Sequence, residues 1–93
     1  MNLNGKYILI NKNNVNSTFE YLYKNGYKHR FYTIEELLGV VLKTFKSREF
    51  CYICVYTYDY HSLDWWYVSD PTNSVYLNAN FILRESKLKR ILK

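Results

Sequence analysis

The clearest hydrophobic pattern of the chain lies between residues 33 and 46. Apolar residues recur every three or four positions there, at Ile34, Leu37, Leu38, Val41, Leu42 and Phe45. Thr33 and Glu36 stand in the order of a capping box, which satisfies free backbone amides at the start of a helix. Lys43 and Lys46 place positive charge where the helix dipole is negative. The pattern predicts an amphipathic helix that buries one face.

Two shorter elements are expected before this helix. The stretch "KYILIN", residues 6–11, is rich in β-forming residues and predicts a strand. Ser17 and Glu20 repeat the capping-box order, apolar residues follow at helical spacing, and Asn25-Gly26 can end a helix in a left-handed conformation. We therefore expect a second helix over residues 17–25.

Residues 50–60, "FCYICVYTYDY", alternate with a period of two, as in a β-strand. One face carries Phe50, Tyr52, Cys54, Tyr56, Tyr58 and Tyr60, and the other carries Cys51, Ile53, Val55, Thr57 and Asp59. His61-Ser62 forms a turn and Leu63–Ser69 returns, which predicts an aromatic hairpin over about 50–69. The smaller face suits the apolar stripe of the long helix, so the tyrosines are expected on the other side of the sheet.

The last third of the chain has two overlapping patterns. From Val75 the apolar residues alternate as in a strand, whereas Asn80 can cap a helix that reaches Ile91. We expect a strand beginning near Val75 and a helix starting between residues 80 and 85. The predicted fold class is α+β: a small antiparallel sheet of three to five strands with the aromatic hairpin at its centre, packed on one face by two to three helices.

Length and composition favour one folded domain spanning residues 1–93. The chain is 48% hydrophobic and 23% charged, which is typical of a globular protein. No apolar run reaches the ~20 residues that a membrane-spanning helix requires, and the first residues do not resemble a signal peptide. We therefore expect a cytoplasmic protein. The abundance of Tyr, Asn, Lys and Ile and the scarcity of Ala, Pro and Gly suggest AT-rich coding, which favours a phage or virus as the source.

Cys51 and Cys54 form a Cys-x-x-Cys, a spacing found in zinc and redox sites. In a strand, however, positions i and i+3 point to opposite faces, about 10 Å apart at ~3.3 Å per residue. A disulfide needs α-carbons within about 4.4–6.8 Å. We interpret both residues as structural thiols, and we expect no metal and no cofactor.

Charge is distributed in blocks that bear on partners. Residues 49–80 contain Glu49, Asp59, Asp64 and Asp70 but no Lys or Arg. A block with this charge repels phosphates, so base stacking on the tyrosines is disfavoured. Basic residues that can bind nucleic acid lie on either side of the block, in two groups: Lys24, Lys28 and Arg30, and Arg84, Lys87, Lys89, Arg90 and Lys93.

The tyrosine side of the hairpin has two interpretations that the sequence leaves open. It is either packed internally or it is a surface for a protein partner, because Tyr and Trp are enriched in interface hot spots. In the second case the partner-binding residues are Tyr52, Tyr56, Tyr58, Asp59, Tyr60, Asp64, Trp65, Trp66 and Tyr67.

The sequence favours a non-enzymatic binding protein that inhibits or modulates a host nucleic-acid-handling or defence protein, with acidic residues steering it to a basic partner. The alternative is direct DNA or RNA binding through the two basic groups. A lesser alternative is a small ribonuclease using His29 as acid–base, with Arg30 and Tyr32 nearby. No catalytic residues are assigned. A homodimer through the tyrosine face or the strand edges is also expected.

Overall fold

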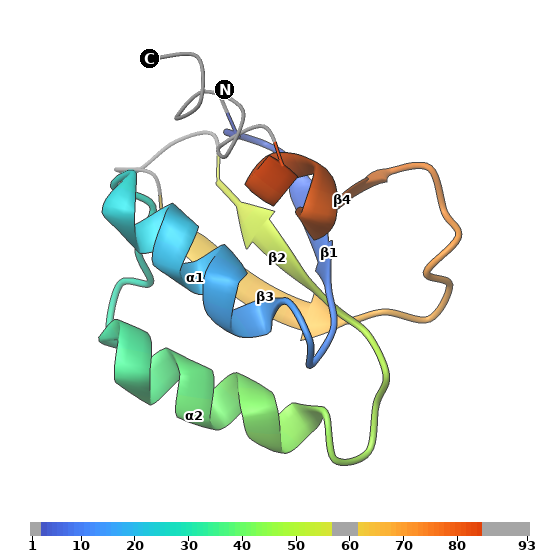
Figure 1. Ribbon diagram of the computed structural model, residues 1–93, viewed down its shortest axis with the longest axis horizontal. Helices are drawn as coiled ribbons and strands as arrows, with labels where there is room; N and C mark the ends of the chain where they lie inside the picture. The colour runs from blue at the N-terminus through green and yellow to red at the C-terminus, as the bar shows by residue number, and fades with distance from the viewer. Residues whose placement is uncertain (1–2, 57–61, 85–93) are drawn as a thin grey trace.

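The computed structural model describes residues 3–56 and 62–84 and shows an open four-stranded sheet with helices on one side (Figure 1). The strands are β1 (Tyr7–Ile10), β2 (Cys51–Val55), β3 (Leu63–Tyr67) and β4 (Tyr76–Asn78), and the helices α1 (Val15–Lys24) and α2 (Ile34–Thr44). Residues 79–84 are helical as well. The α+β class that the sequence predicts is thus confirmed.

The sheet is mixed, with the strand order β3-β2-β1-β4. β2 pairs with β1 and with β3 in antiparallel fashion, whereas β1 pairs with β4 in parallel. The expectation of a wholly antiparallel sheet with the hairpin at its centre was therefore wrong in two respects. The β2–β3 hairpin lies at one side of the sheet, and β1 is the inner strand that joins it to β4.

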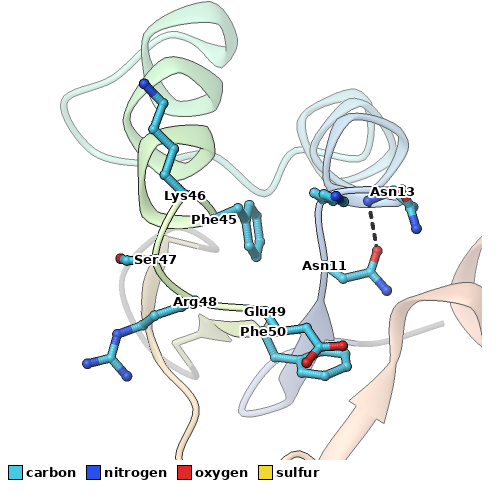
Figure 2. Close-up of a pocket in the computed structure, with 9 residues that line it drawn as sticks. Asn11, Asn13, Phe45, Lys46, Ser47, Arg48, Glu49 and Phe50 are labelled. Carbon is cyan, nitrogen blue, oxygen red and sulfur yellow. Dashed lines mark hydrogen bonds between the residues drawn. The ribbon is translucent and has the colours of Figure 1, made fainter.

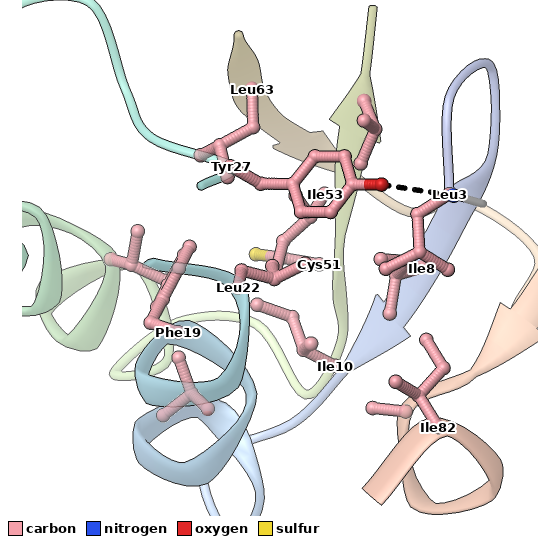
Figure 3. Close-up of a cluster of buried hydrophobic side chains, with 14 of the residues drawn as sticks. Leu3, Ile8, Ile10, Phe19, Leu22, Tyr27, Cys51, Ile53, Leu63 and Ile82 are labelled. Carbon is pink, nitrogen blue, oxygen red and sulfur yellow. Dashed lines mark hydrogen bonds between the residues drawn. The ribbon is translucent and has the colours of Figure 1, made fainter. Parts of the chain in front are cut away.

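All the described helices cover the same face of the sheet, and the core lies between the two layers (Figures 1 and 3). The largest fully buried side chains are Phe19, Leu3, Ile8, Ile10, Leu22, Leu37, Ile53, Leu63, Ile82, Val15, Val41 and Val55. Tyr27 closes one end of this core, where its hydroxyl accepts a hydrogen bond from the backbone N–H of Leu3 at 3.3 Å.

The start of α1 differs from the sequence prediction. The helix begins at Val15, and Asn14 occupies the cap position, so the Ser17–Glu20 capping box was a wrong prediction. Asn11 and Asn14 account for the difference. The Asn11 side-chain oxygen accepts from the N–H groups of Asn13 (2.8 Å) and Asn14 (3.2 Å), and the Asn14 side chain accepts from the Asn11 N–H at 2.9 Å. This reciprocal turn places the first helical residue two positions before Ser17.

The longer helix and β4 agree with their sequence patterns, whereas the last helix begins at residue 79, before the predicted range of 80 to 85, and its cap is Asn78 and not Asn80. The predicted capping box of α2 is present, with Thr33 accepting from the Glu36 N–H and Glu36 accepting from the Thr33 N–H. Leu37 and Val41 are fully buried, although Leu42 is 42% exposed. β4 leads directly into the helical residues 79–84, whose first turn is capped by the Asn78 side chain. The remainder of the predicted C-terminal helix lies outside the described residues.

Candidate functional site

The sheet has one helix-covered face and one face on which none of the described helices lies. Ile8, Ile53 and Leu77 are paired across three strands on the covered face. The opposite face carries the alternate strand residues Tyr7, Leu9, Tyr52, Cys54, Asp64, Trp66, Tyr76 and Asn78. We call this surface the tyrosine face. The side of the sheet that the sequence predicts for the tyrosines is therefore confirmed for Tyr52, the member of the predicted set that lies in a described strand.

On the tyrosine face, Tyr52 contacts two tyrosines that come from two other strands. The ring of Tyr52 lies 5.5 Å from that of Tyr7, at an interplanar angle of 83°, and 5.2 Å from that of Tyr76, at 41°. Burial raises the pKa of the Tyr52 hydroxyl, and the neighbouring Tyr76, Cys54 and Tyr7 add to the shift. Because the rings are inclined to one another, they form an interlocked aromatic patch and not a flat platform of parallel rings.

Trp66 extends the patch onto β3. It is paired with Tyr52 in the strand register and is 54% exposed. Alternation along β3 puts Trp66 on one side and the pair Trp65 and Tyr67 on the other, and the register places Trp66 with the tyrosines. Tyr7 and Tyr76, which sequence reasoning missed, complete the patch. Their alternation was visible, but only strand pairing brings them to Tyr52.

Trp65 and Tyr67 do not belong to this surface, although the sequence predicts them as partner-binding residues. Trp65 is half-buried and packs against the core, and Tyr67 lies on the same side of the strand. The Arg48 guanidinium stacks over the Tyr67 ring at 4.0 Å. The predicted residues Tyr58, Asp59 and Tyr60 lie outside the described residues.

Asp64 has an internal role at the outer edge of β3. The Tyr56 N–H donates to the Ser62 carbonyl, so by alternation the backbone groups of Leu63, Trp65 and Tyr67 point away from β2. The Leu63 N–H donates to the Lys28 carbonyl at 3.3 Å, and the Trp65 N–H donates to the Asp64 carboxylate at 2.8 Å. The carboxylate therefore occupies an edge amide that would otherwise be open to another strand.

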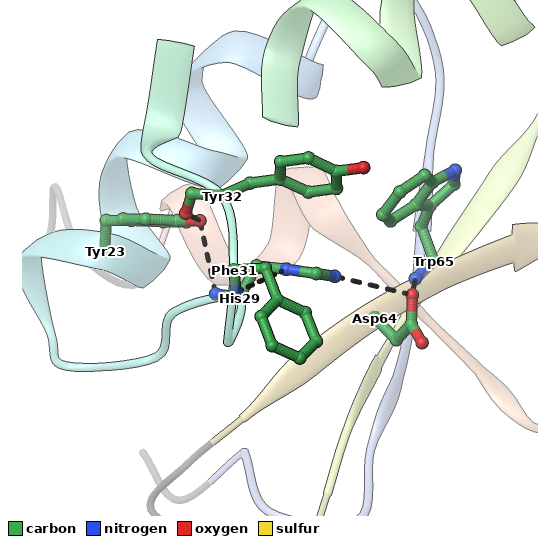
Figure 4. A network of polar contacts seen from close by, with 6 residues as sticks. All are labelled: Tyr23, His29, Phe31, Tyr32, Asp64 and Trp65. Atoms are coloured by element: carbon green, nitrogen blue, oxygen red, sulfur yellow. Dashed lines mark hydrogen bonds and ion pairs between the residues drawn. The ribbon is translucent and has the colours of Figure 1, made fainter. Parts of the chain in front are cut away.

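His29 lies beside this edge in an aromatic cluster (Figure 4). Its ring is 4.8 Å from Tyr32 and 5.7 Å from Trp65. The Phe31 N–H donates to His29 Nδ1 at 3.1 Å, which leaves the proton of the neutral ring on Nε2, 4.0 Å from an Asp64 carboxylate oxygen. Tyr23 braces the segment, because its hydroxyl accepts from the His29 N–H and donates to the Tyr32 carbonyl.

This arrangement bears on the ribonuclease alternative. The fold supplies an acidic neighbour that the sequence did not reveal, and a cavity of about 310 Å³ adjoins it, lined by His29, Arg30, Phe31, Tyr56, Ser62, Leu63 and Asp64. A general base, however, needs a ring nitrogen that can reach the substrate. Nδ1 of His29 accepts a backbone hydrogen bond and Nε2 faces Asp64, so neither nitrogen is directed at a substrate in this conformation.

The two cysteines are free and lie on opposite faces of β2, as the alternation predicts. Cys51 is fully buried under the helices, and Cys54 is half-buried on the tyrosine face. Burial raises the pKa of both thiols, opposed for Cys51 by the positive charge of Arg48 and reinforced for Cys54 by the negative charge of Asp64. Within the described ranges, no three metal-ligating side chains come together.

The described members of the two predicted basic groups, Lys24, Lys28, Arg30 and Arg84, are exposed. Lys28 forms a bridge with Ser62 beside β3, Arg30 follows it, and Lys24 ends α1. Arg84 belongs to the helical residues that follow β4, at the other edge of the sheet. Lys87, Lys89, Arg90 and Lys93 lie outside the described residues. Lys28 therefore lies beside β3 at one edge of the sheet, whereas Arg84 belongs to a helical segment that packs over the covered face.

A larger cleft, which sequence reasoning missed, opens between the β1–α1 loop and the segment joining α2 to β2 (Figure 2). Its volume is about 460 Å³, and its lining is Asn11, Lys12, Asn13, Phe45, Lys46, Ser47, Arg48, Glu49 and Phe50. We call it the loop cleft. Its residues come from two segments more than thirty positions apart, so no local motif indicates it.

Comparisons with known proteins give no indication of function, so the function is inferred from the fold and its surfaces. No protein-family model matches the chain, and neither a curated protein nor a solved structure is significantly similar to it. In the part of the chain that the structure describes, no helix is long and apolar enough to cross a bilayer.

Proposed function

We propose that this chain is a non-enzymatic binding protein that acts by protein–protein contact through the tyrosine face. The observation that carries the proposal is the cluster of Tyr7, Tyr52, Tyr76 and Trp66 on the sheet face opposite the helices. Rings of this kind offer large contact area at a low cost in side-chain entropy, and Tyr and Trp are enriched among residues that dominate binding energy.

The size of the face limits the kind of contact. Four strands of three to five residues, spaced ~4.8 Å apart, make a flat footprint of roughly 270 Å². A stable interface usually buries about 800 Å² on each partner. A partner therefore extends beyond the strands onto neighbouring segments, or the contact is a transient one.

The aromatic side chains of the tyrosine face support the proposal more strongly than its acidic residues do. None of the strand residues on the tyrosine face is Lys or Arg, so the face does not repel a basic partner. Asp64, which the sequence analysis assigned to steering, bonds to the Trp65 N–H and faces His29. Asp70 accepts bonds from the Thr72 N–H and hydroxyl, which lower its pKa. Both carboxylates thus have local roles.

The partner that we propose is a host nucleic-acid-handling or defence protein, which the chain inhibits or modulates. The support for this identity is the small size, the residue usage typical of AT-rich phage or viral coding, and the excess of basic over acidic residues outside residues 49–80. Enzymatic activity is less favoured, because Nδ1 of His29 accepts a backbone hydrogen bond and Nε2 faces the Asp64 carboxylate at 4.0 Å.

The proposal is tested by comparing two double variants of the immobilised protein in extracts of a low-GC bacterium. Trp66→Ser with Tyr76→Ser removes rings from the tyrosine face, and Phe31→Ser with Leu42→Ser removes exposed apolar residues elsewhere. We expect a specific protein to be retained by the wild type and the second variant but lost from the first. Capture that is equal for all three proteins contradicts the proposal.

Sedimentation tests whether the partner is a second copy of the chain. If the wild type is a dimer that Trp66→Ser converts to a monomer, the contact partner is the chain itself. A dimer that persists in Trp66→Ser and in both double variants would mean that the tyrosine face is not the contact surface.

A further inference from the structure

The strand residues of the tyrosine face lie in two rows that cross the sheet in the order β3-β2-β1-β4 (Figure 1). The first row is Asp64, Cys54, Tyr7 and Tyr76, and the second is Trp66, Tyr52, Leu9 and Asn78. The second row begins with two aromatic residues and the first row ends with two. Rings from all four strands therefore form one oblique band across the sheet, which we call the aromatic band: Trp66, Tyr52, Tyr7 and Tyr76.

The dimensions of the aromatic band fit a polyproline-II helix. Three inter-strand spacings separate β3 from β4, about 14 Å at ~4.8 Å each. A polyproline-II helix rises ~3.1 Å per residue, so about five residues cover this length. Its turn of three residues advances ~9.3 Å, which is close to the ~9.6 Å of two strand spacings. Residues i and i+3 of such a helix therefore reach rings on strands that are two apart.

The polar atoms of the aromatic band complement the backbone of a polyproline-II helix. That backbone has no internal hydrogen bonds, so its carbonyl groups need donors, and proline has no N–H to offer in return. The three tyrosine hydroxyls and the indole N–H of Trp66 are donors carried on apolar rings. Within residues 3–56 and 62–84, none of these four groups has a hydrogen-bond partner. The band thus offers donors to a ligand that is rich in acceptors.

The charge of the tyrosine face indicates a basic residue beside the prolines. None of the strand residues on this face is Lys or Arg, whereas Asp64 lies at the β3 end of the first row. The Oδ1 atom of Asp64 accepts from the Trp65 N–H and faces His29, and within the described ranges Oδ2 has no partner. Its side chain is 35% exposed. A cation on the ligand can pair with this carboxylate, whereas the phosphates of a nucleic acid would meet no cation on these strands.

We propose that the tyrosine face binds a proline-rich segment of its partner, in the polyproline-II conformation, with the pattern Pro-x-x-Pro and a basic residue beside Asp64. One proline packs against Trp66 and Tyr52, and the other packs against Tyr7 and Tyr76. The inference rests on the proposed protein contact and names the chemistry of the partner. It accounts for the small area of the face, because a preformed helix loses little conformational entropy when it binds.

The first test uses a fluorescein-labelled nonaproline peptide with a terminal arginine, and fluorescence anisotropy measures its affinity. The control peptide keeps the arginine and carries serine in place of every proline. We expect the proline peptide to bind roughly tenfold more tightly or better. Equal affinity for the two peptides, or no binding of the proline peptide, overturns the inference. If the protein nevertheless captures a cellular protein in a manner that depends on Trp66 and Tyr76, the proposed protein contact stands without it.

Ring variants locate the peptide on the sheet. Trp66→Ser should weaken binding of the proline peptide by roughly tenfold or more, because it removes an aromatic side chain from the band. Tyr67→Ser is the matched control, since Tyr67 is the next residue of β3 and is similarly exposed, at 58% against 54%, but lies on the other side of the strand. Circular dichroism checks that both variants are folded. Unchanged affinity of folded Trp66→Ser, or an equal loss in the control, overturns the inference.

A charge variant locates the basic end of the peptide. Asp64→Asn should weaken binding of the arginine-tailed peptide by roughly threefold and leave binding of nonaproline without arginine unchanged. Asp70→Asn is the control, because Asp70 is an exposed acid in the loop after β3. An equal effect of the two variants overturns the placement of the basic residue.

Two further outcomes would assign the tyrosine face to another occupant. Binding of a labelled hexathymidylate that depends on Trp66, without binding of the proline peptide, would identify single-stranded nucleic acid as the ligand. A dimer that depends on Trp66 and that the proline peptide does not dissociate would identify a second copy of the chain. Either result overturns the inference.

Discussion

The two faces of the sheet are built from neighbouring residues of the same strands, yet they differ in burial and in side-chain composition. On β2, Ile53 is fully buried under the helices, whereas the adjacent Tyr52 is half-buried among other rings. The covered face is mainly aliphatic on β1 and β2 and carries Trp65 and Tyr67 on β3, whereas the tyrosine face is mainly aromatic and retains hydroxyl groups. The covered face therefore supplies the core of the fold, whereas none of the described helices packs on the tyrosine face.

The most severe test of this contrast substitutes one residue on each face. Ile53→Ala should lower the free energy of unfolding by about 2–5 kcal/mol, because it leaves a cavity in the core. Trp66→Ser should change it by less than ~1 kcal/mol, because Trp66 is 54% exposed. Urea unfolding of the two variants measures both values. Equal losses would mean that the tyrosine face is part of the stabilising core.

A smaller effect is expected from the cap of the helix that covers the sheet. Thr33→Ala removes the side chain that accepts from the Glu36 N–H, and should cost about 1 kcal/mol. Ser17→Ala is the matched control, because Ser17 lies inside α1 and is exposed. Thermal unfolding distinguishes the two positions. A larger loss from Ser17→Ala would restore the capping box that the sequence suggested and contradict the observed start of α1.

The smallest effect concerns the two thiols, which report on the two faces without altering stability. Cys54, half-buried on the tyrosine face, should react with an aromatic disulfide reagent faster than the fully buried Cys51. Because burial raises the pKa of both thiols, the folded protein should react slowly near neutral pH and faster as alkali forms the thiolate. Single-cysteine variants separate the two rates. Faster reaction of Cys51 would mean that the helices do not seal the covered face.

Local patterns predicted much of this fold because they depend on one element at a time. Alternation around Ile53 predicted which side of β2 meets the helices, and Thr33 predicted the start of α2. The start of α1 was missed because Asn11 and Asn14 form a turn that competes with Ser17 as the cap.

The candidate sites were less predictable because they depend on pairing between distant segments. Alternation alone could not tell which of Trp65 and Trp66 joins the tyrosines, since the hairpin register decides it. Alternation also could not predict that Asp64 lies beside His29, or that Lys12 and Phe50 line the same cleft. The parallel pairing of β1 with β4 was likewise invisible, because it depends on a connection that returns the chain across the sheet.

The central position of β1 has a consequence for the way the chain folds. Ile8 pairs with Ile53 and with Leu77, separations of 45 (53 − 8) and 69 (77 − 8) residues. Both neighbours of β1 are therefore joined to it by long connections, the first of which contains α1 and α2, and bringing their ends together costs entropy before the pairing can offset it. During synthesis, β1 emerges early but has no partner strand until β2 is made, and its second edge stays open until residues 76–78 follow. The protein thus depends on its last described strand to close the sheet that its first strand begins.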